Sequence, residues 1–155
     1  LTVRNISKTV SVKTRLHPEH PERGFRTFRI MPERGEAGFW VSTQDASLMK
    51  KGGVIRFMGL FNVQIGNAEA GVIEAVFHSK SHEEAKKLGV PLIHWVPAET
   101  GIPCEVITPD VTMARGVGEE TCRRLKLDDI IQFERFGFVR VDEAAPKLTA
   151  YYAHR

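Results

Sequence analysis

Polar and apolar residues alternate with a period of two along much of this sequence. Residues 9–14 alternate in this way, as expected of a strand with one buried face. Residues 54–65 form the longest such candidate, because most odd positions are apolar and the even positions include Arg, Asn and Gln. Gly66 and Asn67 predict a turn, after which residues 72–77 return as the partner strand. The pattern predicts a protein built mainly from strands.

Further segments of strand character are short, and helix signals are few. The strand candidates are residues 25–30, 38–42, 92–96, 104–108, 130–141 and 148–153. Many short strands at regular spacing are typical of sandwiches and barrels, so an all-β fold is predicted. Ser81 predicts a helix N-cap with Glu84 reaching back to it, and Gly89 and Pro91 end that helix. Another turn or two of helix is expected within residues 118–125.

Length and composition limit the class of protein. A chain of 155 residues suits one ordinary domain or two small barrels, and 42% hydrophobic with 26% charged residues is a globular composition. No apolar run approaches the ~20 residues of a membrane helix, and residues 1–13 lack the pattern of a secretion signal. Cys104 and Cys122 lie 18 positions apart, which excludes a disulfide framework. We therefore expect a cytoplasmic chain with reduced thiols and no membrane partner.

Positive charge is concentrated in the first part of the chain. Residues 1–60 hold eleven Lys or Arg and five Asp or Glu, a net charge of +6, whereas residues 61–155 have a net charge of −3. Thirteen of the 22 basic residues are Arg, whose planar guanidinium suits phosphate and stacking partners. A basic half favours a nucleic-acid partner, and an ordinary solvated surface is the alternative interpretation.

Catalytic and metal-binding patterns are weak. The closely spaced histidine pairs, His17 with His20 and His78 with His82, lack the four converging ligands of a zinc site. His94 lies in an apolar strand and is expected to be a hydrogen-bonded core residue. Neither of the glycine-rich phosphate-binding motifs, GxxxxGK(S/T) and GxGxxG, occurs in the sequence. No pair of carboxylates has a spacing that suggests catalysis. A binding module is therefore the better class.

Residues 130–142 carry the most informative side chains, and we interpret them as one strand. Gln and Arg side chains can each form two hydrogen bonds to a base edge, and Arg can also stack on a base. Gln132 and Arg135 fall on opposite faces of a regular strand, so one shared site requires a bulge or a sharp twist. Gly137 is the candidate for that irregularity. The alternative is a surface ion pair between Glu134 and Arg135.

Two short motifs carry a family resemblance. They are Ile93-His94-Trp95-Val96 and Gln132-Phe133-Glu134-Arg135-Phe136-Gly137-Phe138. Together they resemble the C-terminal anticodon-binding region of class I glutamyl- and glutaminyl-tRNA synthetases. The spacing in the first barrel of that region is matched by His17-Pro18, Pro21-Glu22, Gly24 and Arg26. Residues 54–63 and 150–155 look like the archaeal-type glutamyl enzyme, so the resemblance covers essentially the whole chain.

The resemblance implies two adjacent β-barrels of a ribosomal-protein-like type with one or two short helices. Residues 6–91 would form the distal barrel, and residues 1–5 with 92–155 the proximal barrel, whose core Trp95 and His94 hold. The family's nucleotide-binding signatures are absent, and the chain begins inside a strand-like segment. We therefore expect an excised C-terminal region, whose missing N-terminal catalytic domain joins glutamate to tRNA using ATP and magnesium. This chain itself is expected to hold no cofactor, no metal and no catalytic residue.

The resemblance also implies which side chains contact tRNA. In glutaminyl members the Gln and Arg of the second motif contact the middle anticodon base, a uridine that glutamate anticodons share, so Gln132 and Arg135 carry over. Those members have an amide at the position of Glu19 and a Lys-Arg pair where this chain has Ser47-Leu48. The departures fit a glutamate enzyme, whose third anticodon base is cytidine rather than guanosine. The remaining RNA contacts are chosen for charge and placement: Arg26, Lys50 and Lys51.

We accordingly expect a monomer that binds the anticodon loop of tRNA(Glu). One alternative is the same region of a glutaminyl-tRNA synthetase, which the two departures and the tyrosine-rich ending disfavour. Another is a free-standing β-barrel module that binds RNA or protein. A third is a cysteine hydrolase, because Cys104 with one of the histidines could form a Cys/His pair, although no flanking nucleophile signature accompanies it.

Overall fold

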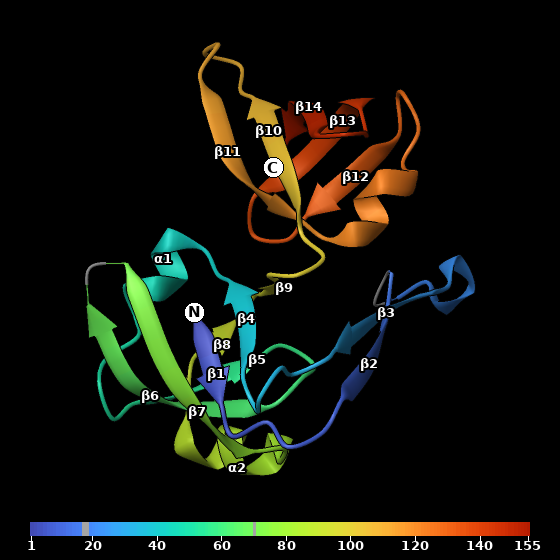
Figure 1. Ribbon diagram of the computed structural model, residues 1–155. Coiled ribbons are helices and arrows are strands. Elements are labelled where there is room, and N and C mark those ends of the chain that lie inside the picture. The colour runs from blue at the N-terminus through green and yellow to red at the C-terminus, as the bar shows by residue number, and fades with distance from the viewer. Residues whose placement is uncertain (17–18, 70) are drawn as a thin grey trace. The chain divides into compact units, whose positions relative to one another are not determined.

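The computed structural model describes residues 1–16, 19–69 and 71–155 (Figure 1). Two compact units make up the chain, Leu1–Ala98 (unit 1) and Glu99–Arg155 (unit 2), and each has its own hydrophobic core. Strands predominate in both units and the helices are short, so the predicted all-β fold is confirmed. In the described residues no helix combines the length and the apolar character that crossing a membrane requires.

Unit 1 is built on a seven-stranded sheet with the strand order β8-β5-β6-β7-β1-β4-β9. Its strands are β1 (Thr2–Arg4), β4 (Ala37–Trp40), β5 (Val54–Phe57), β6 (Asn62–Glu69), β7 (Val72–Ser79), β8 (Leu92–Ile93) and β9 (Val96–Pro97). Neighbours pair antiparallel, except that β1 with β7 and β5 with β8 are parallel. A separate antiparallel hairpin consists of β2 (Val10–Arg15) and β3 (Phe25–Ile30), and a short 3-10 helix, η1 (Pro21–Arg23), lies between them.

The ends of unit 1 differ from the boundaries that the resemblance implies. β1 pairs with both β4 and β7, β8 pairs with β5, and β9 pairs with β4. Residues 1–5 and 92–98 therefore belong to unit 1, whereas the resemblance groups residues 1–5 with 92–155. The physical reason is hydrogen bonding, because β1 pairs on both sides within this sheet and β8 and β9 form its two edge strands. Which unit is distal in a complete enzyme stays a prediction.

Aromatic side chains fill the core of unit 1. Three of them are at most 1% exposed, Phe39, Phe57 and Phe61. Trp95 packs edge-on against Phe39 with a centroid distance of 5.6 Å, and its Nε1 donates to the Met58 carbonyl oxygen at 2.9 Å. The indole thus buries its rings without losing a hydrogen bond. Trp95 therefore lies in a hydrophobic core as expected, but the core is that of unit 1 and not that of residues 99–155, and His94 is only half-buried.

The single strand expected over residues 54–65 is in fact two strands. β5 and β6 are joined by a turn in which Gly59 has φ 70°, and Ile55 pairs with Val63, eight positions later. Directly paired residues of antiparallel strands point to the same side of the sheet, so an even separation keeps the alternation in phase across the turn. The turn predicted at residues 66–67 is wrong, because both lie inside β6 next to a register shift.

Two short α-helices complete unit 1, α1 (Thr43–Ala46) and α2 (His82–Leu88). The predicted start of α2 is confirmed, because the Ser81 hydroxyl accepts a hydrogen bond from the Glu84 N–H at 3.1 Å. Gly89, with φ 60°, ends the helix as expected. The Glu84 carboxylate, however, accepts a hydrogen bond from the Ser79 hydroxyl rather than reaching back to Ser81.

Unit 2 is a five-stranded sheet with the order β11-β10-β14-β13-β12 (Figure 1). Its strands are β10 (Ile102–Ile107), β11 (Met113–Gly118), β12 (Ile130–Phe133), β13 (Gly137–Glu143) and β14 (Leu148–His154), and the 3-10 helix η2 (Glu120–Arg124) falls within the helical turn expected there. Fully buried side chains form the core, among them Ile102, Val139, Val141 and Leu148. β11 was not predicted, because Gly116 and Gly118 weaken its alternation.

Candidate nucleic-acid interface

The motif residues Gln132 and Arg135 lie in the β12–β13 hairpin, not on one strand as expected. β12 ends at Phe133, which pairs with Gly137 at the start of β13, and three residues form the turn between them. Ile131 pairs with Val139, again eight positions later, so the alternation continued through the turn and hid it. The hairpin removes the difficulty of opposite faces, because Arg135 lies at its tip and Gln132 on β12 just before it. Both side chains are exposed.

The tip of this hairpin has an unusual backbone. The Phe136 N–H donates to the Phe133 carbonyl at 3.0 Å, which closes a β-turn whose third residue is Arg135. Arg135 has φ 63°, a conformation that favours Gly or Asn and costs a residue with a Cβ roughly 1–2 kcal/mol. A large cationic side chain is therefore held at a strained and exposed position. Strain of this kind is typical of functional sites.

Gly137, the expected irregularity, is needed on steric grounds. Its φ is 145°, and a Cβ there would lie 2.8 Å from the Tyr152 ring and 2.9 Å from the His154 carbonyl oxygen. Only glycine allows β14 to approach the hairpin this closely. This close approach fixes the position of Gly137, which directly follows the turn that carries Arg135.

The outer face of the hairpin continues from Gln132 onto the neighbouring strands. Gln132 pairs with Phe138, which in turn pairs with His154, and the rings of Phe138 and His154 stack with a centroid distance of 4.6 Å. In the next row Arg140 lies over the Tyr151 ring at 5.5 Å and forms an ion pair with Asp128. Polar, aromatic and cationic groups on one open sheet face are the combination with which proteins bind unpaired bases.

The three predicted contacts in unit 1 do not lie together. Arg26 is half-buried on the inner face of β3, where its Nε donates to the Thr14 hydroxyl at 3.1 Å. Thr14 lies beside Gly59, in the turn after β5. Lys50 and Lys51 are exposed in a turn before β5, which the Gly53 N–H closes by donating to the Lys50 carbonyl at 2.9 Å. Arg26 and the two lysines therefore lie at opposite ends of β5.

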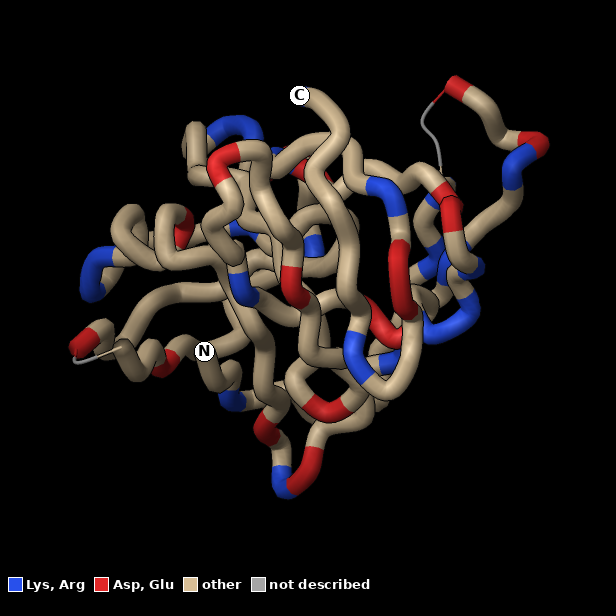
Figure 2. The backbone as a smooth tube through the Cα atoms, turned by 90° about the horizontal axis from the view of Figure 1, so that it is seen from above, with Lys and Arg blue, Asp and Glu red and all other residues tan. Residues whose placement is uncertain are grey.

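A set of basic residues that the sequence analysis did not single out lies on the outer face of the β2–β3 hairpin. In Figure 2 Lys and Arg positions gather along this hairpin. Its side chains alternate strictly between exposed and partly or fully buried, and the exposed positions are Ser11, Lys13, Arg15, Phe25, Thr27 and Arg29. The sequence already indicated part of this basic face, because the alternation over residues 9–14 places Lys13 among the positions that point to solvent.

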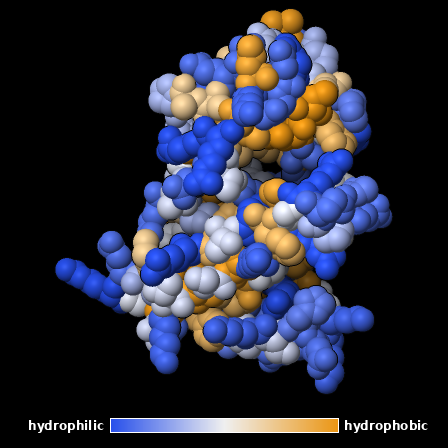
Figure 3. Space-filling view, turned by 90° about the vertical axis from the view of Figure 1, so that its right-hand side faces the viewer, coloured by the Kyte–Doolittle hydropathy of each residue, from blue (hydrophilic) through white to orange (hydrophobic). Residues whose placement is uncertain are grey.

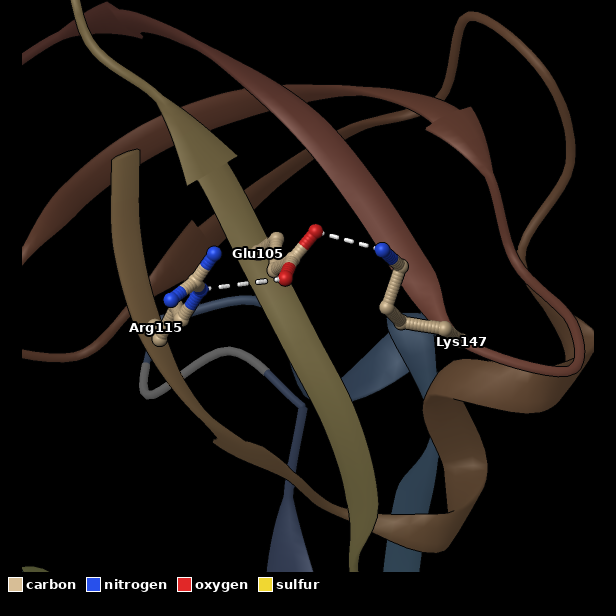
Figure 4. Close-up of polar contacts among 3 residues, drawn as sticks. All are labelled: Glu105, Arg115 and Lys147. Carbon is tan, nitrogen blue, oxygen red and sulfur yellow. Dashed lines mark hydrogen bonds and ion pairs between the residues drawn. The ribbon is translucent and has the colours of Figure 1, made fainter. Parts of the chain in front are cut away.

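Unit 2 also contains an ion-pair cluster on β10 (Figure 4). Glu105 accepts a hydrogen bond from Lys147 and, at 3.2 Å, one from the Arg115 Nε. The hydrogen bond from Lys147 lowers the pKa of the Glu105 carboxyl below its ordinary value, and Arg115 adds to the shift. The cluster links three segments of unit 2, because Glu105 lies on β10, Arg115 on β11 and Lys147 directly before β14. We therefore assign it a structural role.

Both cysteines, Cys104 and Cys122, are buried thiols outside any disulfide. Burial raises the pKa of the Cys104 thiol to about 11, and the nearby Cys122 and Glu105 add to the shift. A thiol with so high a pKa is almost entirely protonated at neutral pH and is a poor nucleophile. The geometry therefore gives no support to a cysteine hydrolase.

The candidate metal ligands are scattered. Within residues 1–16, 19–69 and 71–155 no group of three or more His, Cys, Asp or Glu side chains is placed to hold an ion. His78 contacts the neighbouring Ser79 hydroxyl at 3.2 Å, and the His20 Nδ1 contacts the Glu22 carboxylate at 2.8 Å. His17 and Pro18 of the expected loop lie outside the described residues.

Comparison with protein families gives two matches. Both family models are described as the anticodon-binding domain of class I tRNA synthetases (E and Q), one over residues 1–81 and the other over residues 92–142. These ranges contain the motif residues Gln132 and Arg135 and the basic β2–β3 hairpin.

Curated relatives match along nearly the whole chain. The glutamate–tRNA ligase of Methanothermobacter thermautotrophicus is 39% identical over 155 residues, which is 100% of this chain and 26% of that protein. The glutamate–tRNA ligase of Pyrococcus furiosus is 45% identical over 92% of this chain and 24% of its own length, and that of Methanopyrus kandleri is 33% identical over 99% of this chain. The chain thus spans about a quarter of these relatives. With one family model over more than half of its residues and relatives at such identity, this chain belongs to the anticodon-binding domain family of class I glutamyl- and glutaminyl-tRNA synthetases.

Proposed function

We propose that this chain is the anticodon-binding region of a glutamate–tRNA ligase and that it binds the anticodon loop of tRNA(Glu). The observation that carries the proposal is the β12–β13 hairpin, which holds Arg135 in a strained turn at its tip and Gln132 on its exposed face. In the complete enzyme a catalytic domain would attach glutamate to the tRNA with ATP and magnesium. This chain would supply recognition and no cofactor, as a monomer in the cytoplasm.

Gln132 and Arg135 have the chemistry to read the middle uridine of the anticodon. Uridine offers two carbonyl acceptors and one N–H donor on its base. A Gln amide can donate and accept at the same time, whereas an Arg guanidinium only donates and can also stack on the base. Arg135→Ala should therefore cost about 1–3 kcal/mol of binding and flatten the preference for uridine.

Arg26, Lys50 and Lys51 are proposed to contact phosphate rather than base edges. Phosphate contacts set affinity for every sequence alike and carry no base preference. The exposure of Lys50 and Lys51 supports this role.

Glutamate is favoured over glutamine as the amino acid of the complete enzyme. The three relatives described above are named glutamate–tRNA ligases, and Glu19 with Ser47-Leu48 replaces the glutaminyl pattern. The two anticodons share the middle uridine and differ at the third base. A stem-loop with cytidine at that position should bind more tightly than one with guanosine, and the reverse order would favour the glutaminyl alternative.

A labelled anticodon stem-loop tests RNA binding itself. Affinity should fall by about 0.7–0.9 log units per phosphate contact for each tenfold rise in salt. The titration is made at two salt concentrations, with an unrelated hairpin of the same length as the control. Salt-independent binding, or equal binding of the control hairpin, would contradict the proposal.

A further inference from the structure

The outer face of the β2–β3 hairpin is a basic surface that no RNA contact named so far uses. The inner face packs Val10, Val12, Phe28 and Ile30 against the core of unit 1. The six outward residues, Ser11, Lys13, Arg15, Phe25, Thr27 and Arg29, are all exposed. The core contacts hold the ribbon in place, so its outer face is presented as a fixed row of side chains.

The charge of this face has one sign. Neither strand of the hairpin contains an acidic residue, and three of the six outward side chains are cations. Among the residues that the structure describes, no carboxylate forms an ion pair with Lys13 or Arg29. Concentrated positive charge of this kind is complementary to a phosphate backbone. Figure 3 faces the side to which the hairpin points in Figure 1, and many hydrophilic side chains project there among neutral and hydrophobic ones.

An exposed aromatic ring lies among these cations. Phe25 is 49% exposed, and the Lys13 Nζ lies 4.3 Å from the centre of its ring. Phe25 opens β3 and pairs with Arg15, the last residue of β2, so the ring stands at the outer end of the ribbon. Aromatic rings flanked by Lys or Arg are stacking platforms for unpaired bases, with the cations binding the adjoining phosphates.

We infer that the outer face of the β2–β3 hairpin binds unpaired nucleotides of the anticodon arm, with one base stacked on Phe25 and its flanking phosphates on Lys13 and Arg29. The inference rests on the proposed function, since it adds a second contact for the same RNA. Arg26 points to the opposite face, so the two sets of contacts are separable by mutation.

The charge part is tested with the double variant Lys13→Gln/Arg29→Gln. Losing two phosphate contacts should weaken binding of the labelled stem-loop about 25-fold at 0.1 M salt and lower the salt slope by about 1.4. The matched control is Lys86→Gln/Lys87→Gln, two exposed lysines of α2 in the same unit, which should leave affinity and slope unchanged. Equal behaviour of the two double variants would overturn the inference.

The stacking part is tested with Phe25→Leu and Phe25→Tyr. Leu keeps an apolar side chain and loses the ring face, so stem-loop binding should weaken at least about fivefold, whereas Tyr should retain it. Thermal melting of both variants separates binding from folding, because the Lys13–Phe25 contact could also serve the hairpin alone. Wild-type affinity of a folded Phe25→Leu variant would overturn the inference.

Photo-crosslinking gives a readout that a structural role cannot produce. Stem-loops with 5-iodouridine at each loop position in turn should yield a crosslink to Phe25 from one of them. If the wild-type protein does not bind the stem-loop at all, the proposed function fails. If it binds and no position crosslinks to the β2–β3 hairpin, only this inference fails. A further outcome would also overturn the inference. If the wild-type protein binds polyglutamate, and the double variant loses that binding but still binds RNA, the face binds an acidic protein instead.

Discussion

Arg135 has a backbone conformation that costs stability, and the proposed role in base recognition would account for it. Its φ of 63° at the third position of the turn suits glycine better than arginine. Arg135→Gly should therefore leave the melting temperature unchanged or raise it, while the preference of the protein for uridine is lost. Thermal melting and binding to stem-loops with each middle base measure the two effects. A lowered melting temperature with the base preference intact would assign Arg135 to an ion pair with Glu134 instead.

Gly137 is predicted to tolerate no side chain. Gly137→Ala would place a Cβ 2.8 Å from the Tyr152 ring at a φ of 145°, so both steric overlap and backbone strain oppose it. We expect a loss of about 2 kcal/mol or more in the free energy of unfolding, measured by chemical denaturation. Gly116→Ala is the matched control, because nothing lies within 4 Å of the point that its Cβ would occupy and its φ is not in the left-handed range. Equal stability of the two variants would contradict this account of the tip.

At the scale of the elements, a buried polar network attaches α2 to the sheet of unit 1. Arg56 is 8% exposed and donates to the Asn62 Oδ1 at 2.8 Å. The Asn62 Nδ2 donates to the Ser79 hydroxyl at 2.9 Å and to the carbonyl of Ser81, the N-cap of α2, at 2.8 Å. One amide thus connects β5, β6, the end of β7 and the start of the helix.

Removing that amide should be costly. Asn62→Ala leaves the Arg56 charge buried with fewer acceptors, for which we expect a loss of about 3–5 kcal/mol in the free energy of unfolding. Chemical denaturation measures it, and Gln64→Ala, on the exposed parity of the same strand, is the control. The double variant Arg56→Leu/Asn62→Leu should recover part of the loss, because it removes the charge as well. A loss of less than about 1 kcal/mol in the free energy of unfolding of Asn62→Ala would mean that the network does not hold α2 on the sheet.

The ion-pair cluster of unit 2 gives a pH dependence. Because the pKa of Glu105 is lower in the folded protein than in the unfolded chain, its contribution to stability is complete above the unfolded value of about 4.3 and is lost as the pH falls through the folded pKa. Glu105→Gln should therefore destabilise the protein at pH 7 and have little effect once the carboxyl is protonated in both states. Melting curves from pH 7 down to pH 3 compare variant and parent, and a constant difference over that range would contradict the assignment.

The hairpins mark where prediction from the sequence reached its limit. Alternation identified the strands of residues 9–14, 25–30, 72–77 and 148–153 well, because each has one buried face. It could not divide residues 54–65 or 130–141, since even-numbered separations across those turns keep the pattern in phase. The same limit hid the position of Arg135 at a hairpin tip, although the residue itself was identified from the motif.

At the scale of the whole molecule, the sequence indicated the family and the sign of the charge better than the location of individual contacts. The basic residues 1–60 drew attention to Arg26, Lys50 and Lys51, which the structure distributes over opposite ends of β5. Lys13, Arg29 and Phe25 share one face only because two strands pair in a particular register. Alternation within one strand does not reveal the register in which that strand pairs with another.

Stability of the whole chain is expected not to depend on a metal ion. The described residues contain no group of three or more His, Cys, Asp or Glu that could hold a metal ion, and a structural metal would contribute much of the folding free energy. Treatment with EDTA should therefore leave the melting temperature unchanged. A drop of several degrees that added zinc reverses would contradict this expectation.

The most direct test of anticodon recognition is the affinity of the wild-type protein for four stem-loops that differ only at the middle anticodon base. The account predicts that uridine binds more tightly than the other three bases by about 1–3 kcal/mol, and that Arg135→Ala reduces this difference with little change in the melting temperature. Equal affinities for all four bases in the wild-type protein would contradict the assignment of Gln132 and Arg135 to base recognition.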